Sequence, residues 1–151
     1  RYYCPQGHCT FSLLPDCYAA RLSGELSKVE AAVRAFEQAG TREAACGSLR
    51  LDIELPGALR WLGRRLAAVH AALVVLKGLL PERFGGCAAT LSAFGERLGV
   101  AEVLVALRGI AEVFLAQLPK PLGFLPRRPP GRGRDRARQQ RVGADPPGRP
   151  A

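Results

Sequence analysis

The sequence predicts an all-α fold, a bundle of helices followed by a disordered basic tail. Apolar residues recur at steps of three and four along several segments, which is typical of helices with one dry face. Proline and glycine stand where these segments begin or end. A chain of 151 residues is also long enough to bury a core. We expect one helical domain at residues 1–118 and a tail at 119–151.

The first predicted helix covers about residues 16–39 and follows an irregular arm at residues 1–14. Asp16 is a suitable N-cap, and Gly40 is a suitable C-terminal stop. Charged residues from Glu25 to Glu37, Glu30 among them, are assigned to the faces that point away from the core. The apolar seam consists of Ala19, Leu22, Leu26, Val29, Val33 and Phe36.

A long connection is expected at residues 41–55. Within it, residues 49–55 alternate between apolar and charged, a period of two that predicts an extended segment. A link of this length can span a bundle from end to end. The first two long helices can therefore run parallel, as in bundles with a long first crossover.

The second helix is expected at residues 56–80, between Pro56 and Pro81. Trp61, Val74 and Val75 lie off its apolar seam, so we expect this helix to be buried on several sides. The seam consists of Leu59, Leu62, Leu66, Val69, Leu73, Leu76 and Leu80.

Two further helices are expected at residues 87–98 and 100–118. In the last one, an inward seam of Val100, Val103, Leu107, Ile110 and Phe114 would leave a mixed apolar and charged outer face. Such a face is typical of a protein-binding surface, although another element could equally cover Val105 and Leu115. The candidate surface consists of Glu102, Val105, Arg108, Glu112 and Leu115. The corresponding outer face of the first helix, which could simply be solvated, contains Arg21, Lys28 and Arg34.

Cysteine usage favours an oxidising compartment. An odd number of cysteines leaves one unpaired within the chain, and the sequence does not decide the pairing. Cys4, His8, Cys9 and Cys17 match the spacing of no common structural zinc site, so we expect neither metal nor cofactor. The candidate disulfide residues are Cys4, Cys9, Cys17, Cys46 and Cys87.

Catalysis is not expected. The chain has two histidines, and His70 has no carboxylate three or four positions away. Asp52 and Glu54 share one side of the extended segment, where a solvated face is the simpler interpretation.

The tail concentrates the positive charge of the chain. Residues 119–151 contain nine Lys and Arg against two Asp, which is +7 of the total +9. Such a tail can bind heparan sulfate, nucleic acid or anionic lipid, or it can serve only to keep the chain soluble. We expect no membrane span, because the longest charge-free run of the second helix is too short to cross a bilayer.

Several segments resemble secreted helical cytokines. Residues 9–15 and 46–51 resemble the start and first crossover of interferon-lambda proteins, through Cys9, Cys46 and Leu49-Arg50-Leu51. Residues 62–81 and 93–98 resemble the second half of interleukin-10, and residues 55–57 resemble the interleukin-6/interleukin-11 group. The resemblance, closest to the class II family, implies a secreted four-helix-bundle ligand that bridges cell-surface receptor chains without catalysis. By that resemblance the outer faces of the first and last helices contact the receptors.

Two other classes of function remain open. One is an amphipathic-helix protein that binds lipid or an apolar ligand. The other is an intracellular nucleic-acid-associated protein that acts through its tail, for which reduced cysteines are expected. The sequence leaves the receptor and the oligomeric state undecided.

Overall fold

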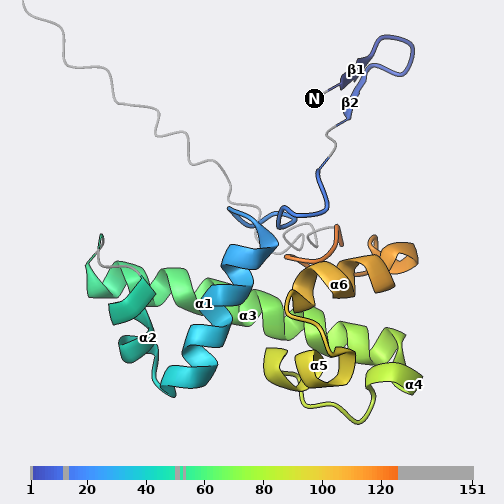
Figure 1. The fold of residues 1–151 in the computed structure, drawn as a ribbon. Coiled ribbons are helices and arrows are strands. Elements are labelled where there is room, and N and C mark those ends of the chain that lie inside the picture. Colours follow the sequence, from blue (N-terminus) through green and yellow to red (C-terminus); the bar gives the residue numbers. More distant parts are fainter. Residues whose placement is uncertain (1, 12–13, 50–51, 53, 126–151) are drawn as a thin grey trace, which may run out of the picture.

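The computed structural model describes residues 2–11, 14–49, 52 and 54–125. This part of the chain is mostly helical, as the sequence predicts. A hairpin of β1 (Tyr2–Cys4) and β2 (Cys9–Phe11) stands away from the helices (Figure 1). The helices are α1 (Leu26–Ala39), α2 (Arg42–Leu49), α3 (Leu55–Leu79), α4 (Pro81–Phe84), α5 (Leu91–Leu98) and α6 (Val103–Ile110), followed by a 3₁₀ turn, η1 (Glu112–Phe114).

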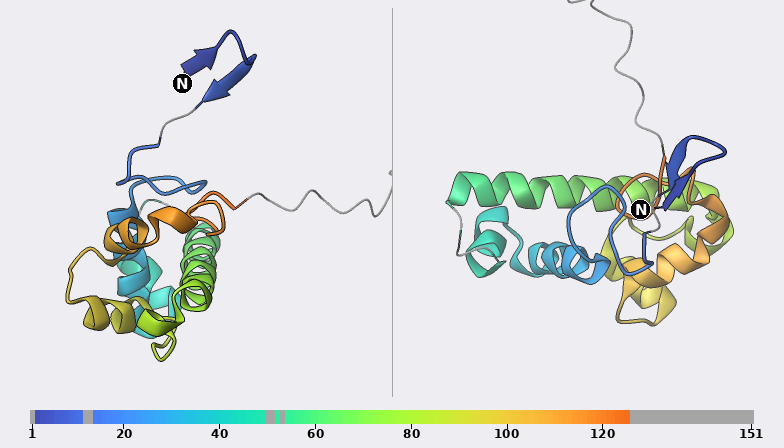
Figure 2. Two further views of the ribbon diagram at one scale, coloured as in Figure 1. Left: turned by 90° about the vertical axis from the view of Figure 1, so that its right-hand side faces the viewer. Right: turned by 90° about the horizontal axis from the view of Figure 1, so that it is seen from above.

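The helices are arranged around α1, which contacts α2, α3, α5 and α6. It crosses α3 at a steep angle, so the parallel alignment expected for the first two long helices is not found (Figures 1 and 2). The N-terminal half of α3 lies beside α2, and α5 and α6 lie toward its C-terminal half (Figure 1). The all-α prediction is confirmed, with α1 rather than α3 at the centre of the arrangement.

The predicted seam of α3 is confirmed, because each of its residues is buried or half-buried. One large cluster joins α1, α3, α5 and α6, and includes Val29, Leu73 and Phe94. A smaller cluster joins α1, α2 and α3 through Ala32, Cys46 and Leu62. The expectation that α3 is buried on several sides is wrong, since Val74 is 47% exposed and a whole face of the helix meets solvent.

The first helix begins at Leu26 instead of Asp16. Arg21 and Gly24 have positive φ angles of 54° and 99°, a left-handed conformation that an α-helix cannot continue through. Residues 16–25 form a folded loop in which the backbone N–H of Leu26 donates to the carbonyl of Cys17. Ala19 is buried in this loop, so the apolar periodicity before Leu26 reflects burial of a loop rather than a helical turn.

The connection after the first helix has about the expected length, but it contains helix α2. The Thr41 hydroxyl accepts a bond from the backbone N–H of Ala44 and so begins α2. Leu49 lies in α2, and residues 50, 51 and 53 of the expected extended segment lie outside the described residues. Further on, the helix predicted at 87–98 begins only at Leu91, after the Thr90 cap.

The last helix ends at Ile110, well before the predicted residue 118. The chain then turns back, so that Leu118 and Leu122 are fully buried against the core. The Phe124 and Leu125 backbone N–H groups donate to the carbonyls of Leu115 and Leu118. Residues 119–125 therefore belong to the folded domain, contrary to the predicted tail boundary. Residues 126–151 of that tail lie outside the described residues.

Candidate ligand-binding groove

Two carboxylates on α1 hold the beginnings of α5 and α6 in place. Glu37 accepts bonds from the backbone N–H groups of Leu91 (2.8 Å) and Ser92 (3.1 Å), and from the Ser92 hydroxyl. Glu30 accepts bonds from the N–H groups of Val103 and Leu104, at 3.1 and 2.9 Å. These N–H groups have no partner within their own helices. The assignment of Glu30 to a solvent face is wrong, because this side chain is buried.

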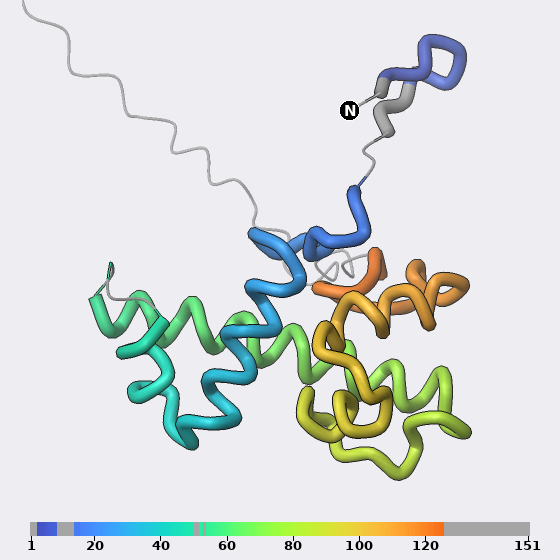
Figure 3. The backbone as a smooth tube through the Cα atoms, in the orientation of Figure 1, coloured from blue at the N-terminus to red at the C-terminus, as the bar shows by residue number. Residues whose placement is uncertain are grey.

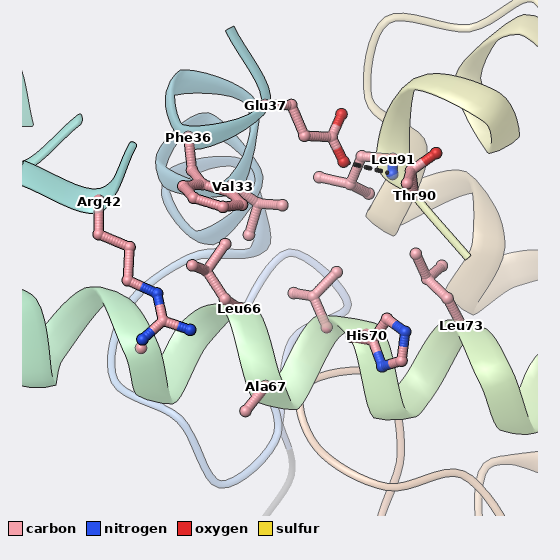
Figure 4. Close-up of a pocket in the computed structure, with 12 residues that line it drawn as sticks. Val33, Phe36, Glu37, Arg42, Leu66, Ala67, His70, Leu73, Thr90 and Leu91 are labelled. Carbon is pink, nitrogen blue, oxygen red and sulfur yellow. Dashed lines mark hydrogen bonds between the residues drawn. The ribbon is translucent and has the colours of Figure 1, made fainter. Parts of the chain in front are cut away.

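The Glu37 contact closes one wall of an apolar groove between α1, α3 and the start of α5 (Figure 4). Its cavity volume is about 340 Å³, within the usual size range of small-molecule sites. The apolar lining comes from the facing sides of α1 and α3, while His70 and Thr90 lie exposed at the rim. The lining residues are Val33, Phe36, Glu37, Arg42, Gly63, Leu66, Ala67, Val69, His70, Leu73, Thr90 and Leu91.

A shallow depression continues from this groove along α3 toward α2. The two hollows share Arg42, Gly63 and Ala67, so they adjoin at the surface. Arg42 extends from the start of α2 toward α3 (Figure 4). Arg60 and Arg64 line the depression, one helical turn apart on the same face. A Cβ atom added at Gly63 would meet nothing within 4 Å. Because glycine has no side chain, the space above Gly63, which we call the passage between the two hollows, is open.

Arg108 is a structural residue in the fold. Its guanidinium donates to the carbonyls of Asp16 (2.8 Å) and Tyr18, and to those of Pro121 (2.8 Å) and Leu122 (3.0 Å). It thus joins the loop before α1 to the segment after η1, which lie side by side in Figure 3. Burial lowers the pKa of Arg108, and the charges of Asp16 and Cys17 oppose that shift.

The structure does not assemble the predicted receptor face of the last helix. Arg108 is buried, which is the clearest departure from the expected outward position. Val105 and Leu115 are half-buried and pack against the core, as the alternative interpretation anticipated. Glu102 and Glu112 are exposed.

The residues predicted on the outer face of the first helix also lie in different surroundings. Arg34 is half-buried, pairs with Glu30 at 2.8 Å, and donates to the carbonyl of Ala101. Lys28 is exposed on α1, and its Nζ lies 3.7 Å from Oε2 of Glu25. Arg21 lies in the loop before α1 and donates to the Leu125 carbonyl.

The predicted cysteine sites are scattered through the fold. Cys46 is buried in the smaller core cluster and Cys17 is exposed, and both are free thiols together with Cys4 and Cys87. Cys4 lies opposite Cys9 in the hairpin register. No group of three metal-ligating side chains occurs within the described residues, and no described helix is long and apolar enough to cross a bilayer. Most of the basic tail lies beyond residue 125.

Sequence reasoning missed the groove and both helix-capping carboxylates. The available signal was the spacing of Gly63 and Ala67, which lie one turn apart on α3. Two small residues at this spacing leave a notch on a helix face. Arg60 and Arg64 stand beside this notch with the same spacing. His70, for which no catalytic role was expected, is exposed at the groove rim.

Comparison with known proteins yields no assignment. No family model matches the sequence, and neither characterised proteins nor solved structures show a significant match. The resemblance to cytokines therefore rests on the short segments described above.

Proposed function

We propose that this protein is a non-catalytic binding protein whose groove takes the apolar chain of a single-chain amphiphile. The observation that carries the proposal is an apolar groove of about 340 Å³ that adjoins a depression lined by arginines. Burial of an apolar chain in such a groove is favourable at about 25 cal/mol per Å². Charged groups at one end then fix the orientation of the ligand.

The charges around the groove favour an external ligand over the protein's own tail. Residues 126–151 contain eight Arg against two Asp, so the tail has the same sign as Arg42, Arg60 and Arg64. Glu37, the acidic residue in the lining, already accepts three hydrogen bonds from the start of α5. Electrostatic complementarity therefore selects a ligand with an anionic end.

The test fills the passage between the two hollows. In the Gly63→Leu variant, the new side chain enters open space on α3 and occupies the shared floor. We expect this variant to lose at least tenfold in affinity for the neutral fluorophore N-phenyl-1-naphthylamine, measured by fluorescence titration. The matched control is Gly78→Leu, which also enters open space on α3 but lies outside both hollows. Equal affinity in the two variants would refute the groove as the binding site.

A receptor ligand of the secreted cytokine kind is the second candidate function. One observation favours it: Val113 is 81% exposed beside the exposed Glu112, on the segment that follows α6. An exposed apolar residue next to a charge is common at protein interfaces. This proposal includes secretion and the bridging of cell-surface receptor chains.

Cell-binding measurements test the receptor proposal. Fluorescently labelled protein should bind saturably to at least one of a panel of cultured cell lines. Glu112→Lys should weaken that binding, whereas the same charge reversal at the exposed Glu82 on α4 should not. Absence of saturable binding on every line, or equal effects of the two reversals, would count against a receptor-binding face at Glu112.

A further inference from the structure

The depression beside the groove contains an unusual set of cations. Arg42, Arg60 and Arg64 are exposed side chains that line one hollow. The ion pairs between described residues are Lys28–Glu25 and Arg34–Glu30, so within the described part of the chain these three arginines face no carboxylate partner. Their guanidinium groups are free to bind an external anion.

We propose that this depression binds the phosphate group of a single-chain phospholipid whose apolar chain lies in the groove. The inference rests on the proposed function and adds the chemical class of the headgroup. A phosphate monoester has about two negative charges near neutral pH and three oxygens that accept hydrogen bonds. Three guanidinium groups match that charge and those acceptors better than they match a single carboxylate.

The residues shared by the two hollows carry the second step. Because Arg42, Gly63 and Ala67 line both, a ligand can extend from the apolar groove into the depression without leaving the surface. Glu43 and Glu54 are the acidic residues nearest in sequence to the arginines, and both are exposed to solvent. Neither residue lines either hollow, so the arginines determine the charge of the depression.

The experiment compares two lipids with the same oleoyl chain, below their critical micelle concentrations. Oleoyl-lysophosphatidic acid has a phosphate monoester, and monooleoylglycerol has a neutral headgroup. Each is titrated against the full chain loaded with N-phenyl-1-naphthylamine. We expect the phosphate lipid to displace the fluorophore at concentrations at least tenfold lower. We also expect this advantage to shrink as salt increases, because the arginines are exposed.

Charge-removing variants then assign the effect to the depression. Arg60→Gln with Arg64→Gln should raise the half-displacing concentration of lysophosphatidic acid roughly five- to twentyfold, at up to about fivefold for each exposed charge. The concentration for monooleoylglycerol should stay unchanged. The control is Lys77→Gln with Arg83→Gln, which removes the same charge outside both hollows. Equal losses in the two double variants would overturn the inference.

The remaining outcomes distinguish failure of the phosphate site from failure of the proposed groove function. If both lipids displace the fluorophore equally well, the phosphate site is refuted and the apolar groove stands. If calorimetry shows inorganic phosphate binding that depends on Arg60 and Arg64 while the lipids are indistinguishable, the depression binds free phosphate, which also overturns the inference. If neither lipid displaces the fluorophore and Gly63→Leu has no effect, the proposed function itself fails.

Discussion

Replacing Arg108 by alanine should destabilise the whole domain. The wild-type side chain donates to four backbone carbonyls, two before α1 and two after η1. Leaving buried carbonyls without a donor costs about 1–3 kcal/mol for each group. The Pro121 carbonyl keeps its bond from the Ala20 N–H, and the carbonyls of the exposed Asp16 and Tyr18 will take up water, so we expect a total loss of about 3 kcal/mol in the free energy of unfolding. That is a large part of the 5–15 kcal/mol typical of a domain.

Urea denaturation followed by circular dichroism measures this loss. With a slope of about 1.5 kcal/mol per molar urea, the midpoint should fall by roughly 2 M. Hydrogen exchange should locate the damage at the N–H of Ala20, which donates to the carbonyl of Pro121. The control is Arg97→Ala, which removes an exposed arginine with a single bond to the Arg83 carbonyl. A midpoint for Arg108→Ala within 0.3 M of this control would refute the structural role.

Three further outcomes follow from individual contacts. Glu30→Gln should lower the free energy of unfolding by about 1–2 kcal/mol in urea titrations, because α6 loses a charged cap, whereas the exposed Glu96→Gln should leave it unchanged. Gly63→Ala should raise the free energy of unfolding by about 0.5–1 kcal/mol, because alanine favours a helix more than glycine does. A decrease would show that other atoms already occupy the space beside Gly63. Oxidised glutathione should link Cys4 to Cys9, since opposite residues of an antiparallel pair lie at disulfide distance, and peptide mapping that finds another pairing would contradict this.

Local patterns predicted α3 well, and the bounds of the other helices and their connections poorly. The period of α3 gave its extent to within a residue at each end, since a 25-residue helix contains many repeats of its seam. The start of α1 was misplaced because Ala19 is buried by a loop that turns at Gly24, and periodicity does not distinguish these cases. Helix α2 was missed because eight residues contain little more than two turns.

The candidate site was harder to foresee, because it depends on contacts between distant parts of the chain. Glu37 and Leu91 are 54 positions apart, and nothing in either segment indicates the other. Arg108 was expected on the surface because it lies off the predicted inward seam of the last helix. Its partners are backbone carbonyls. Every residue has one, so the amino-acid sequence does not indicate which of them bind Arg108.

The meeting of the two ends around Arg108 also constrains how the chain can fold during its synthesis. Tyr18 and Arg108 are separated by 90 positions, and Pro121 and Leu122 follow later still. Until Pro121 and Leu122 have left the ribosome, the Arg108 guanidinium lacks two of its four carbonyl acceptors, although the helices before them can already pack together. Closure of the domain is therefore expected only after release of nearly all of its folded residues, through contacts whose long sequence separation slows the final step.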